Sequence, residues 1–512
     1  MIAVEEKSCM EVDHVVKVVD MGIDTHQESV VYMRKDSPVC QSEGFSASSR
    51  LRLKSNGHSL IATLNVVDNH ILPEGCAGLS KVAMHDLQIK SGDTVKIHNA
   101  PLLNSLSLVR KKIYGHKLSE SDIKSIITDI SGHHYTDVAI ASFLSACAGN
   151  RLDVDEIISL TKAMVECGKQ LEWPGHLRIF DKHCIGGLPG NRTTPILVSI
   201  VSSAGLIIPK TSSRAITSPS GTADTMDTLT NVNLKLEEIR HVVGATDACL
   251  VWGGGVSLSP VDDLLIRVER ALDLDGEGQM IASVLSKKIA AGSTHAVIDI
   301  PVGATAKIRT QEEAEKLASM FTLVGAACGI QLRCLITDGS APIGYGIGPV
   351  EEARDILSVL QCQADAPQDL RQRSLFLAAN LLDMAQGDGV EAGIRQATEI
   401  LESGQAWRQF QRIAKAQGGL KTLPNARFQH IEAADRDGVV TAIDNRRLAR
   451  VAKLAGAPTD PAAGLRLAAS LGEPVTKGQP LFTLFSESQG EQDYALAFYR
   501  DNGPVFTIGE SS

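Results

Sequence analysis

The stretch that decides the fold of this 512-residue chain reads Asp181-Lys182-His183-Cys184-Ile185-Gly186-Gly187-Leu188-Pro189-Gly190-Asn191-Arg192-Thr193-Thr194. The strand-like residues 177–180 precede it, and an apolar run with the composition of a buried helix, residues 195–204, follows it. A strand, a glycine-rich turn and a helix in this order predict backbone N–H groups and a positive helix end that face an anion. The segment is not a P-loop, because Asn191 follows Gly190 where that motif has lysine. Taken alone, the turn is better explained by a structural role than by anion binding.

A second polar segment, residues 211–225, strengthens the case for an anion site. Its serine and threonine hydroxyls surround Arg214 and Gly221, and so many donors suit the acceptor oxygens of a phosphate or a ribose. The alternative is a solvated Ser/Thr loop. Since the loop follows the apolar residues 206–209, we expect it to cap a strand within the core.

The rest of the chain predicts a multidomain α/β protein. A chain of 512 residues is expected to form three or four units of roughly 100–200 residues. Residues 30–33, 60–67 and 93–97 have the pattern of strands and predict an N-terminal β domain. Helical segments open after Ser119 and Asp153, strands and helices alternate from about residue 177, and a small C-terminal α+β domain is expected beyond Pro424.

Composition excludes several classes of protein. The net charge of −10 and the 4% of aromatic residues disfavour binding to nucleic acid. The ten cysteines form no zinc-binding pattern, so no metal site is expected. The longest apolar stretch, residues 195–209, is shorter than the roughly 20 residues of a membrane span, and the first residues do not read as a secretory signal. We therefore expect a cytoplasmic enzyme that does not associate with a membrane.

The two polar segments together resemble the thymidine and pyrimidine-nucleoside phosphorylase family. Its motifs are a Lys-His-(Ser/Cys)-x-Gly-Gly turn and a Ser-x-Arg…Gly-Thr-x-Asp loop, which match residues 182–187 and 212–224 here. The chain is most similar to the long-chain branch, which contains archaeal AMP phosphorylase and bacterial type 2 thymidine phosphorylases. The resemblance covers essentially the whole chain and includes residues 258–260, 266–269, 281–288 and 338–349.

The resemblance implies four domains: an N-terminal β domain (1–100), a helical domain (105–175 plus 260–295), an α/β phosphate-binding domain (176–259 plus 296–424) and a C-terminal α+β domain (425–512). It implies a pentosyltransferase that cleaves the N-glycosidic bond of a nucleoside or nucleoside 5′-monophosphate by phosphorolysis. The products would be a free base and ribose 1-phosphate, deoxyribose 1-phosphate or ribose 1,5-bisphosphate, in pyrimidine metabolism or nucleotide salvage. Inorganic phosphate would be the co-substrate without any cofactor, and the enzyme would be a homodimer or a larger homo-oligomer.

The family pattern also implies site residues. The residues expected to bind phosphate are Lys182, Gly187, Thr193, Thr194, Ser212, Ser213 and Thr222. The residues expected to contact the nucleoside or nucleotide are Gly187, Ser213, Arg214, Ala215, Ile216, Thr217, Ser218, Thr222, Ser283, Lys287 and Lys307. The residues expected to act in catalysis are Lys182, His183 and Asp275.

Two side chains compete for the role of proton donor to the leaving base. Asp275 corresponds to the family's proposed donor, but it can act as an acid only if burial or a neighbouring carboxylate raises its pKa. Without the resemblance it would be a solvated turn aspartate. His183 is the competing donor, because imidazole can serve near pH 7, and its alternative role is to orient other groups.

Two lysine positions are placed by spacing as well as by family. Ser283 and Lys287 are four residues apart on a predicted helix and share one face. Without the family, Lys287 and Lys288 would be ordinary solvated lysines. Lys307 follows a predicted strand and a glycine turn, a position from which it can meet a 5′-phosphate.

The chain departs from the short-chain members of the family. Cys184 stands where they have a phosphate-binding serine, and Val268 stands where they have a base-binding arginine. These changes favour the AMP phosphorylase-like branch. A nucleophilic role for Cys184 is disfavoured, since phosphorolysis needs no enzyme nucleophile.

Two rival functions stay open. Phosphoribosyl transfer on the same fold would need Mg²⁺ and an acidic pair, for which Asp224 and Asp227 are the candidates. A non-catalytic nucleotide-binding or assembly protein would bind nucleotide without turnover.

Overall fold

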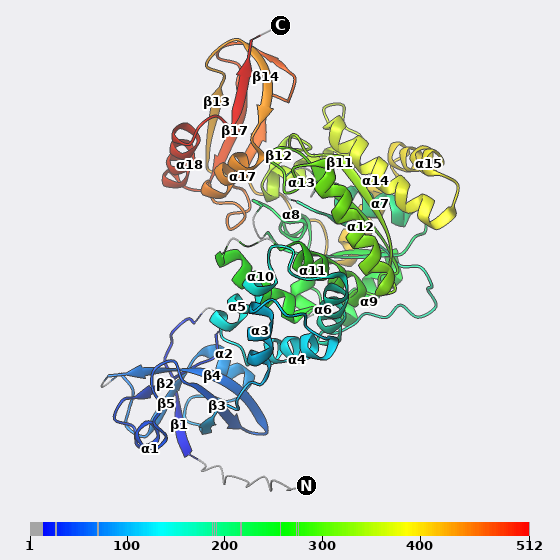
Figure 1. Ribbon diagram of the computed structural model, residues 1–512. Helices are drawn as coiled ribbons and strands as arrows, with labels where there is room; N and C mark the ends of the chain where they lie inside the picture. The colour runs from blue at the N-terminus through cyan, green and yellow to red at the C-terminus, as the bar shows by residue number, and fades with distance from the viewer. Residues whose placement is uncertain are drawn as a thin grey trace. The chain divides into compact units, whose positions relative to one another are not determined.

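The computed structural model describes residues 14–25, 28–68, 71–186, 188, 190, 192–215, 218–256, 258–272, 274 and 276–510. The chain divides into two compact units. One unit contains the residues up to Arg110 together with Asp129–Ala139, and the other contains Lys111–Thr128 and all residues from Ile140 onward. Figure 1 shows their helices and strands.

The first unit is built around a closed β-barrel with the strand order β1-β5-β2-β4-β3-β6. The strands are β1 (His14–Asp20), β2 (Val30–Arg34), β3 (Arg50–Ser55), β4 (His58–Val67), β5 (Cys76–Leu79) and β6 (Thr94–Asn99). Two short helices, α1 (Pro38–Glu43) and α2 (Lys81–Asp86), accompany them. Alternate residues such as Leu51 and Leu53 fill the interior of the barrel. The predicted N-terminal β domain is therefore confirmed.

Helices follow the barrel, as predicted: α3 (Ser105–Ile113), α4 (Glu120–Ser131), α5 (Asp137–Cys147) and α6 (Val154–Glu166). The expected cap at Asp153 is present, because its side chain accepts from the backbone of Glu156 while the Glu156 side chain accepts from the backbone of Asp153. Two later helices, α10 (Pro260–Leu272) and α11 (Glu277–Ala290), return to this region. Helix α11 packs on α6 so closely that a Cβ at Gly278 would lie 3.1 Å from Ile157.

A parallel sheet forms the centre of the second unit. Strand β10 (His295–Val302) pairs in parallel with both β11 (Gln331–Asp338) and β7 (Phe180–Cys184). Strands β8 (Ile208–Ser212) and β9 (Ala248–Trp252) pair in parallel with each other, and a parallel bridge between Ile179 and Ile207 joins the two groups. The α/β domain predicted from alternating strands and helices is therefore confirmed.

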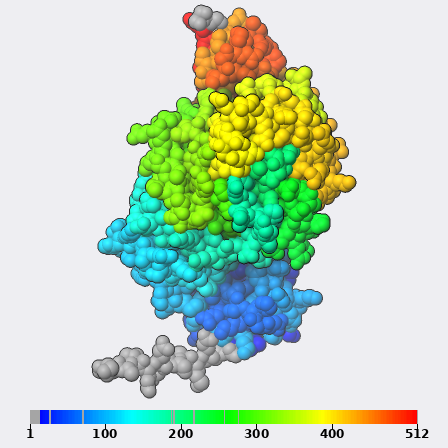
Figure 2. All heavy atoms as spheres, turned by 90° about the vertical axis from the view of Figure 1, so that its right-hand side faces the viewer, coloured from blue at the N-terminus to red at the C-terminus, as the bar shows by residue number. Residues whose placement is uncertain are grey.

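Helices pack around this sheet, either directly on its strands or on one another. They are α7 (Thr193–Ser203), α8 (Thr222–Leu229), α9 (Leu236–Thr246), α12 (Gln311–Ala327), α13 (Pro349–Leu360), α14 (Gln368–Gln386), α15 (Val390–Glu402) and α16 (Gln405–Ala416). Successive residues at the starts of β7 and β8 enter different cores: Phe180 and Ile208, the first strand residues, pack with α7, whereas Ile179 and Ile207, which directly precede them, pack with α9. Figure 2 shows α14–α16 in yellow at the outer surface of this unit.

Two details of the strand prediction were wrong. The strand predicted at residues 177–180 begins at Phe180 and continues to Cys184, because pairing with β10 starts at Phe180 and His295. Leu177 is 92% exposed and lies outside the strand. The segment 332–336, predicted as a buried strand, is only half-buried because β11 forms the edge of the sheet.

The C-terminal region confirms the predicted α+β domain. Its elements are β13 (Phe428–Ala433), β14 (Gly438–Ile443), α17 (Asn445–Leu454), β15 (Gly464–Leu467), β16 (Pro474–Val475), β17 (Pro480–Ser486), α18 (Gln489–Asp501) and β18 (Phe506–Gly509). They form the sheets β12-β15-β17-β13 and β16-β14-β18, of which β12 (Gly346–Ile347) comes from the preceding segment. Within the part of the chain that the structure describes, no helix combines the length and apolar character needed to cross a membrane.

Candidate functional site

The predicted anion-binding segments meet at one edge of the parallel sheet. Strands β7 and β8 run in the same direction, so their last residues, Cys184 and Ser212, both lie at the carboxyl edge of the sheet. The glycine-rich turn leads from this edge into α7, and the Ser/Thr loop leads from it into α8. Two positive helix ends therefore face the edge at which open α/β sheets bind their ligands.

Lys182 provides the positive charge under the glycine-rich turn. Its side chain is fully buried, and its ammonium donates to Thr193 Oγ1 at 2.8 Å and to the Gly190 carbonyl at 3.4 Å. The Thr193 hydroxyl in turn donates to the same carbonyl at 2.8 Å. Among the described residues, no carboxylate lies within 4.0 Å of the ammonium. A buried cation without an anionic partner is costly, and a bound phosphate would supply that partner.

A buried ionic cluster lies on the opposite side of β7. The Asp181 carboxylate, which is fully buried, lies 2.8 Å from Lys288 Nζ on α11 and 3.4 Å from Lys210 Nζ on β8. Burial by itself would raise the pKa of Asp181, but the two ammonium groups hold it below the ordinary value. Lys288, which would be an ordinary solvated lysine without the family resemblance, has a side chain that is 3% exposed and is paired with Asp181. Sequence reasoning assigned no role to Asp181, Lys210 or Lys288, although Asp181 directly precedes Lys182 in the motif.

His183 lies among these positive charges, which disfavour its protonated form. Burial, followed by the nearby ammonium groups of Lys288, Lys210, Lys287 and Lys182, lowers its pKa well below the ordinary value. A protonated His183 is therefore scarce near pH 7, which weakens its candidacy as the proton donor. The neutral ring still carries one N–H group that can donate a hydrogen bond.

The arginine of the second loop is already paired. Arg214 contacts Asp224 at 3.1 Å and Asp227 at 2.8 Å, and its guanidinium lies 5.0 Å from the centre of the Trp252 ring. Asp224 also accepts from the backbone of Ala215 at 2.6 Å. The arginine thus braces the loop, and its charge is largely neutralised before any ligand binds.

Hydroxyl groups from this loop lie at the same edge. Ser212 ends β8, and its buried Oγ has no hydrogen-bond partner in the described part of the chain. Ser213 is half-buried and Thr222 is the first residue of α8, while Ser218 Oγ donates to the Ser220 carbonyl at 2.8 Å. The structure therefore brings these predicted residues together with the start of α8. The predicted residues outside the described set are Gly187, Ile216, Thr217 and Asp275.

The predicted base-binding pair lies on one face of α11, as expected. Lys287 Nζ donates to Ser283 Oγ at 3.2 Å and to Asp262 Oδ2 at 2.7 Å. Val268, at the position where short-chain members have arginine, is 5% exposed and is one of the buried residues of α10. This position therefore offers the base no hydrogen-bond donor.

Lys307 lies directly beside the glycine-rich turn. A Cβ built on Gly186 would stand 2.9 Å from the Cβ of Lys307, and Gly186 has φ of +116°. Both the close approach and the left-handed backbone require glycine at this position. The exposed Lys307 side chain thus starts beside the turn.

Cys184 and Asp299 pack against the glycine-rich turn at Gly190. A Cβ at Gly190 would lie 2.8 Å from Cys184 Sγ and 3.0 Å from Asp299 Oδ2, so the turn rests on both side chains. Burial and the Asp299 carboxylate raise the pKa of the Cys184 thiol well above its ordinary value, which agrees with an inert thiol. Asp299, which accepts from Thr337 at 2.6 Å, was missed because it lies in an apolar strand distant in sequence.

A second buried cluster ties the starts of α7 and α8 to α13. Arg192 is 1% exposed and lies 3.5 Å from Glu352 and 3.9 Å from Asp355. Thr225 on α8 donates to Glu352 at 3.2 Å. Burial raises the pKa of Glu352 to about 7. Arg192 lies within the glycine-rich segment, but the sequence could not identify its partners Glu352 and Asp355, which lie 160 and 163 residues further along the chain.

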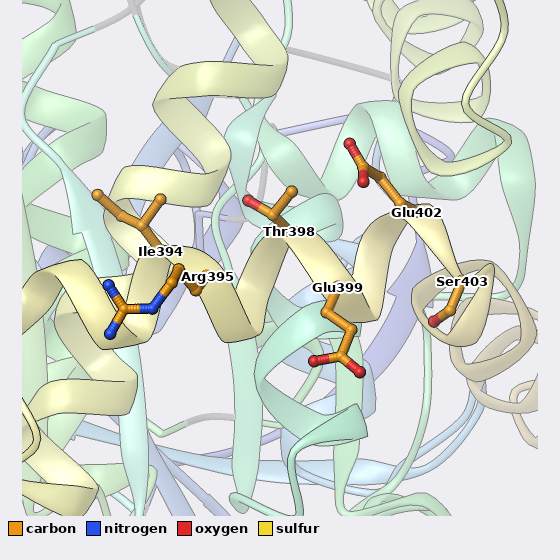
Figure 3. A pocket seen from close by; sticks show the side chains of 6 residues that line it. All are labelled: Ile394, Arg395, Thr398, Glu399, Glu402 and Ser403. Atoms are coloured by element: carbon orange, nitrogen blue, oxygen red, sulfur yellow. The ribbon is translucent and has the colours of Figure 1, made fainter.

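One surface hollow lies outside this site. It has a volume of about 440 Å³ and lies along α15, where its lining residues are Ile394, Arg395, Thr398, Glu399, Glu402 and Ser403. Figure 3 shows that all of these side chains project from one helix. None of the predicted phosphate or base contacts lines it.

Comparisons with known proteins give the family context. The "Glycosyl transferase family, helical bundle domain" matches residues 106–168, the "Glycosyl transferase family, a/b domain" matches residues 176–407, and the "Pyrimidine nucleoside phosphorylase C-terminal domain" matches residues 439–504. "Putative thymidine phosphorylase 2" of Acidovorax sp. (strain JS42) is 54% identical over 490 residues, which cover 96% of this chain and 95% of that protein. "Putative thymidine phosphorylase" of Legionella pneumophila (strain Philadelphia 1) is 52% identical over 498 residues, which cover 97% of this chain and 96% of that protein.

Solved structures share the central fold at low sequence identity. Anthranilate phosphoribosyltransferase from Thermus thermophilus superposes with a TM-score of 0.50 and 18% identity, covering 60% of this chain and 98% of that one. The enzyme of the same name from Saccharomyces cerevisiae gives a TM-score of 0.50 and 18% identity, covering 61% of this chain and 97% of that one. At this identity the likeness concerns the fold alone.

Proposed function

The chain belongs to the thymidine and pyrimidine-nucleoside phosphorylase family, and from this premise we propose that it cleaves a nucleoside 5′-monophosphate by phosphorolysis. The observation that carries the proposed anion site is Lys182, a fully buried ammonium that donates to Thr193 at the start of α7 and has no carboxylate partner among the described residues. In this proposal, inorganic phosphate completes the site. The products are a free base and ribose 1,5-bisphosphate.

Positioning and charge account for the proposed chemistry. Attack of phosphate on the anomeric carbon passes through a transition state with positive charge on the sugar, so an aligned anion both attacks and stabilises it. Lys182 and the first turns of α7 and α8 hold the anion, with Thr193, Thr194, Ser212, Ser213 and Thr222 as its proposed hydroxyl contacts. On the opposite side, Ser283 and Lys287 contact the leaving base.

The leaving base needs a proton or a hydrogen-bond donor. We propose Asp275 as this donor, supported by the family pattern and by the lowered pKa of His183, which leaves the imidazole neutral. Asp275→Asn is expected to lower kcat by about 100-fold or more, within the range that general acid catalysis contributes. His183→Asn is expected to have a smaller effect. A larger loss of kcat in His183→Asn than in Asp275→Asn would assign the donor role to His183.

Two observations support a nucleotide over a nucleoside as the substrate. Lys307 starts beside the glycine-rich turn, where it can meet a 5′-phosphate. Val268 is buried and provides no donor at the position of the pyrimidine-binding arginine. The names of the relatives, which refer to thymidine, favour a nucleoside instead. Nucleosides and nucleoside 5′-monophosphates therefore both have to be tested as substrates.

Phosphoribosyl transfer is the competing reaction on this fold. It would need carboxylates free to hold Mg²⁺ beside a diphosphate, but Asp224 and Asp227 already pair with Arg214, and Asp227 also pairs with Lys421 at 3.0 Å. We accordingly propose catalysis without a metal or an organic cofactor. Base release that is lost in EDTA and restored by Mg²⁺ would contradict this proposal.

The domain boundaries inferred from the family also remain part of the proposal. They place the site between a helical domain (105–175 plus 260–295) and an α/β domain (176–259 plus 296–424). A homodimer or larger homo-oligomer is expected, and sedimentation velocity would measure its size.

One experiment tests the reaction directly. The protein is incubated with thymidine, uridine, adenosine and their 5′-monophosphates, with and without inorganic phosphate, and the free base is followed by chromatography. Phosphate-dependent base release from a monophosphate is the expected result. Base release that is independent of phosphate, or binding of nucleotide without any release, would refute the phosphorylase assignment.

A further inference from the structure

Two pairs of neighbouring residues link the halves of the proposed site. Asp181 and Lys182 are adjacent on β7, and Lys287 and Lys288 are adjacent on α11. Lys182 belongs to the phosphate half, and Lys287 belongs to the base half through Ser283. The 2.8 Å contact between Asp181 Oδ2 and Lys288 Nζ connects the other member of each pair. A path of two peptide bonds and one ion pair thus runs from the phosphate lysine to the base lysine.

The geometry of strand and helix makes this arrangement possible. Neighbouring side chains of a strand point to opposite faces, so Lys182 reaches Thr193 on α7 while Asp181 points toward α11. Neighbouring side chains of a helix diverge by about 100°, so Lys287 reaches Asp262 while Lys288 reaches Asp181. A rotation or a slide of α11 against β7 would move Lys287 and break the pair at the same time.

Stability is a weak explanation for such a pair. Asp181 is fully buried and Lys288 is 2% exposed, and the cost of removing both charges from water offsets much of their attraction. Fixing the relative position of β7 and α11 is a better explanation of this buried ion pair than stability is. Lys210 and Ser293 also lie 3.4 Å from the Asp181 carboxylate, so the carboxylate is held from β8 and from the segment after α11 as well.

We infer that Asp181 and Lys288 form a positioning pair that couples phosphate binding at Lys182 to base binding at Lys287. This inference rests on the proposed function. It adds two residues, Asp181 and Lys288, that are proposed to contact neither phosphate nor base. Phosphate drawn to Lys182 fixes β7 and the turn. Asp181 transmits that constraint to Lys288, and α11 then presents Ser283 and Lys287 to the base.

The chain offers a matched control for the substitution. Lys112 and Glu156 form another buried ion pair, with contacts of 2.6 and 2.7 Å and exposed fractions of 4% and 2%. This pair joins α3 to α6 and shares no residue with the proposed site. Lys288→Met and Lys112→Met therefore remove the same charge from similar surroundings, and only the first breaks the link between the halves.

The test measures coupling between the ligands. Inorganic phosphate is titrated calorimetrically into the full-length protein, alone and with a saturating concentration of the base that the wild type releases. We expect wild type and Lys112→Met to bind phosphate several-fold tighter with the base present. In Lys288→Met the base should no longer change the phosphate affinity, and kcat should fall at least tenfold while the melting temperature falls no further than in Lys112→Met.

Conservative variants keep the test decisive if Lys288→Met does not fold. Lys288→Arg retains the charge and should restore most of the coupling, whereas Asp181→Asn should abolish it as Lys288→Met does. Coupling that persists in Lys288→Met or Asp181→Asn, or that is equally reduced in Lys112→Met, would overturn the inference while leaving the phosphorylase proposal intact. Wild type that binds neither phosphate nor base would instead refute the proposed function, and the inference with it.

Discussion

Replacing Lys182 by methionine removes the buried ammonium that lies under the glycine-rich turn. The side chain is fully buried, so a phosphate bound there would interact with it in a medium from which water is largely excluded. Truncating one partner of a buried, hydrogen-bonded charge pair costs about 2–5 kcal/mol. Since about 1.4 kcal/mol corresponds to a factor of ten, kcat/KM for phosphate should fall by about 30- to several-thousand-fold. Thr193 and the two helix ends remain, which favours the middle of that range.

The assay separates the two substrates. Initial rates of base release are measured across phosphate concentrations at saturating nucleotide, and then across nucleotide concentrations at saturating phosphate. The fall should appear in kcat/KM for phosphate, while the dissociation constant of the nucleotide alone, measured by calorimetry, should change by less than about threefold.

We expect Lys182→Met to fold, so that a loss of activity can be assigned to the phosphate site. The ammonium has no carboxylate partner among the described residues, so its removal leaves no buried anion unpaired, and the main losses are the hydrogen bonds to Thr193 and Gly190. We therefore expect the free energy of unfolding to change by about 1 kcal/mol or less. A variant that is folded and keeps kcat/KM for phosphate within about threefold of wild type would refute the assignment of the phosphate site.

Three further predictions follow from the structure. Lys287→Met should raise KM for the nucleotide about tenfold with little change in phosphate affinity, measured by the same initial-rate assay; an equal change for both substrates would contradict a base-side role. Glu352 should make the protein less stable as pH rises, because burial raises its folded pKa from 4.5 to about 7, so stability that is present below pH 4.5 is lost as the pH rises through 7. Glu352→Gln should remove a difference of about 2.5 kcal/mol between the free energies of unfolding in urea at pH 5 and pH 8, and an unchanged pH profile would disprove this prediction. Cys184 should resist alkylation by iodoacetamide while the exposed Cys362 reacts, and Cys184→Ser should retain turnover; loss of all activity in that variant would reopen the nucleophile interpretation.

The order of elements was predictable because it depends on local pattern. The alternation of β-branched strands and capped helices, such as the Asp153 cap and the apolar helix after Thr193, reports the direction in which side chains are buried. The error at residues 177–180 arose because Asp181, Lys182 and His183 are polar residues within a buried strand. Propensity assigns such residues to a turn, whereas pairing with β10 and the ionic contacts of the folded chain keep them in the strand.

The candidate site was predictable only in part. The residues assigned to phosphate lie in continuous segments that carry their own signal, glycines before one helix and hydroxyls before another. Ile216, Thr217, Gly187 and Asp275 lie outside the described residues, so their roles remain predictions from the family.

Lys288 shows why the remaining part of the site could not be predicted. A lysine beside another lysine near the end of a helix is expected to be solvated. Its ammonium group has a lower free energy in water than in the protein interior unless a buried carboxylate pairs with it. That carboxylate, Asp181, lies more than 100 residues earlier in the chain, and its direction was hidden by the misplaced start of β7. Once the strand begins at Phe180, alternation turns Lys182 toward α7 and Asp181 toward α11. The register of one short strand therefore determines which lysine faces the proposed phosphate and which residue reaches α11, the helix that we propose to contact the base.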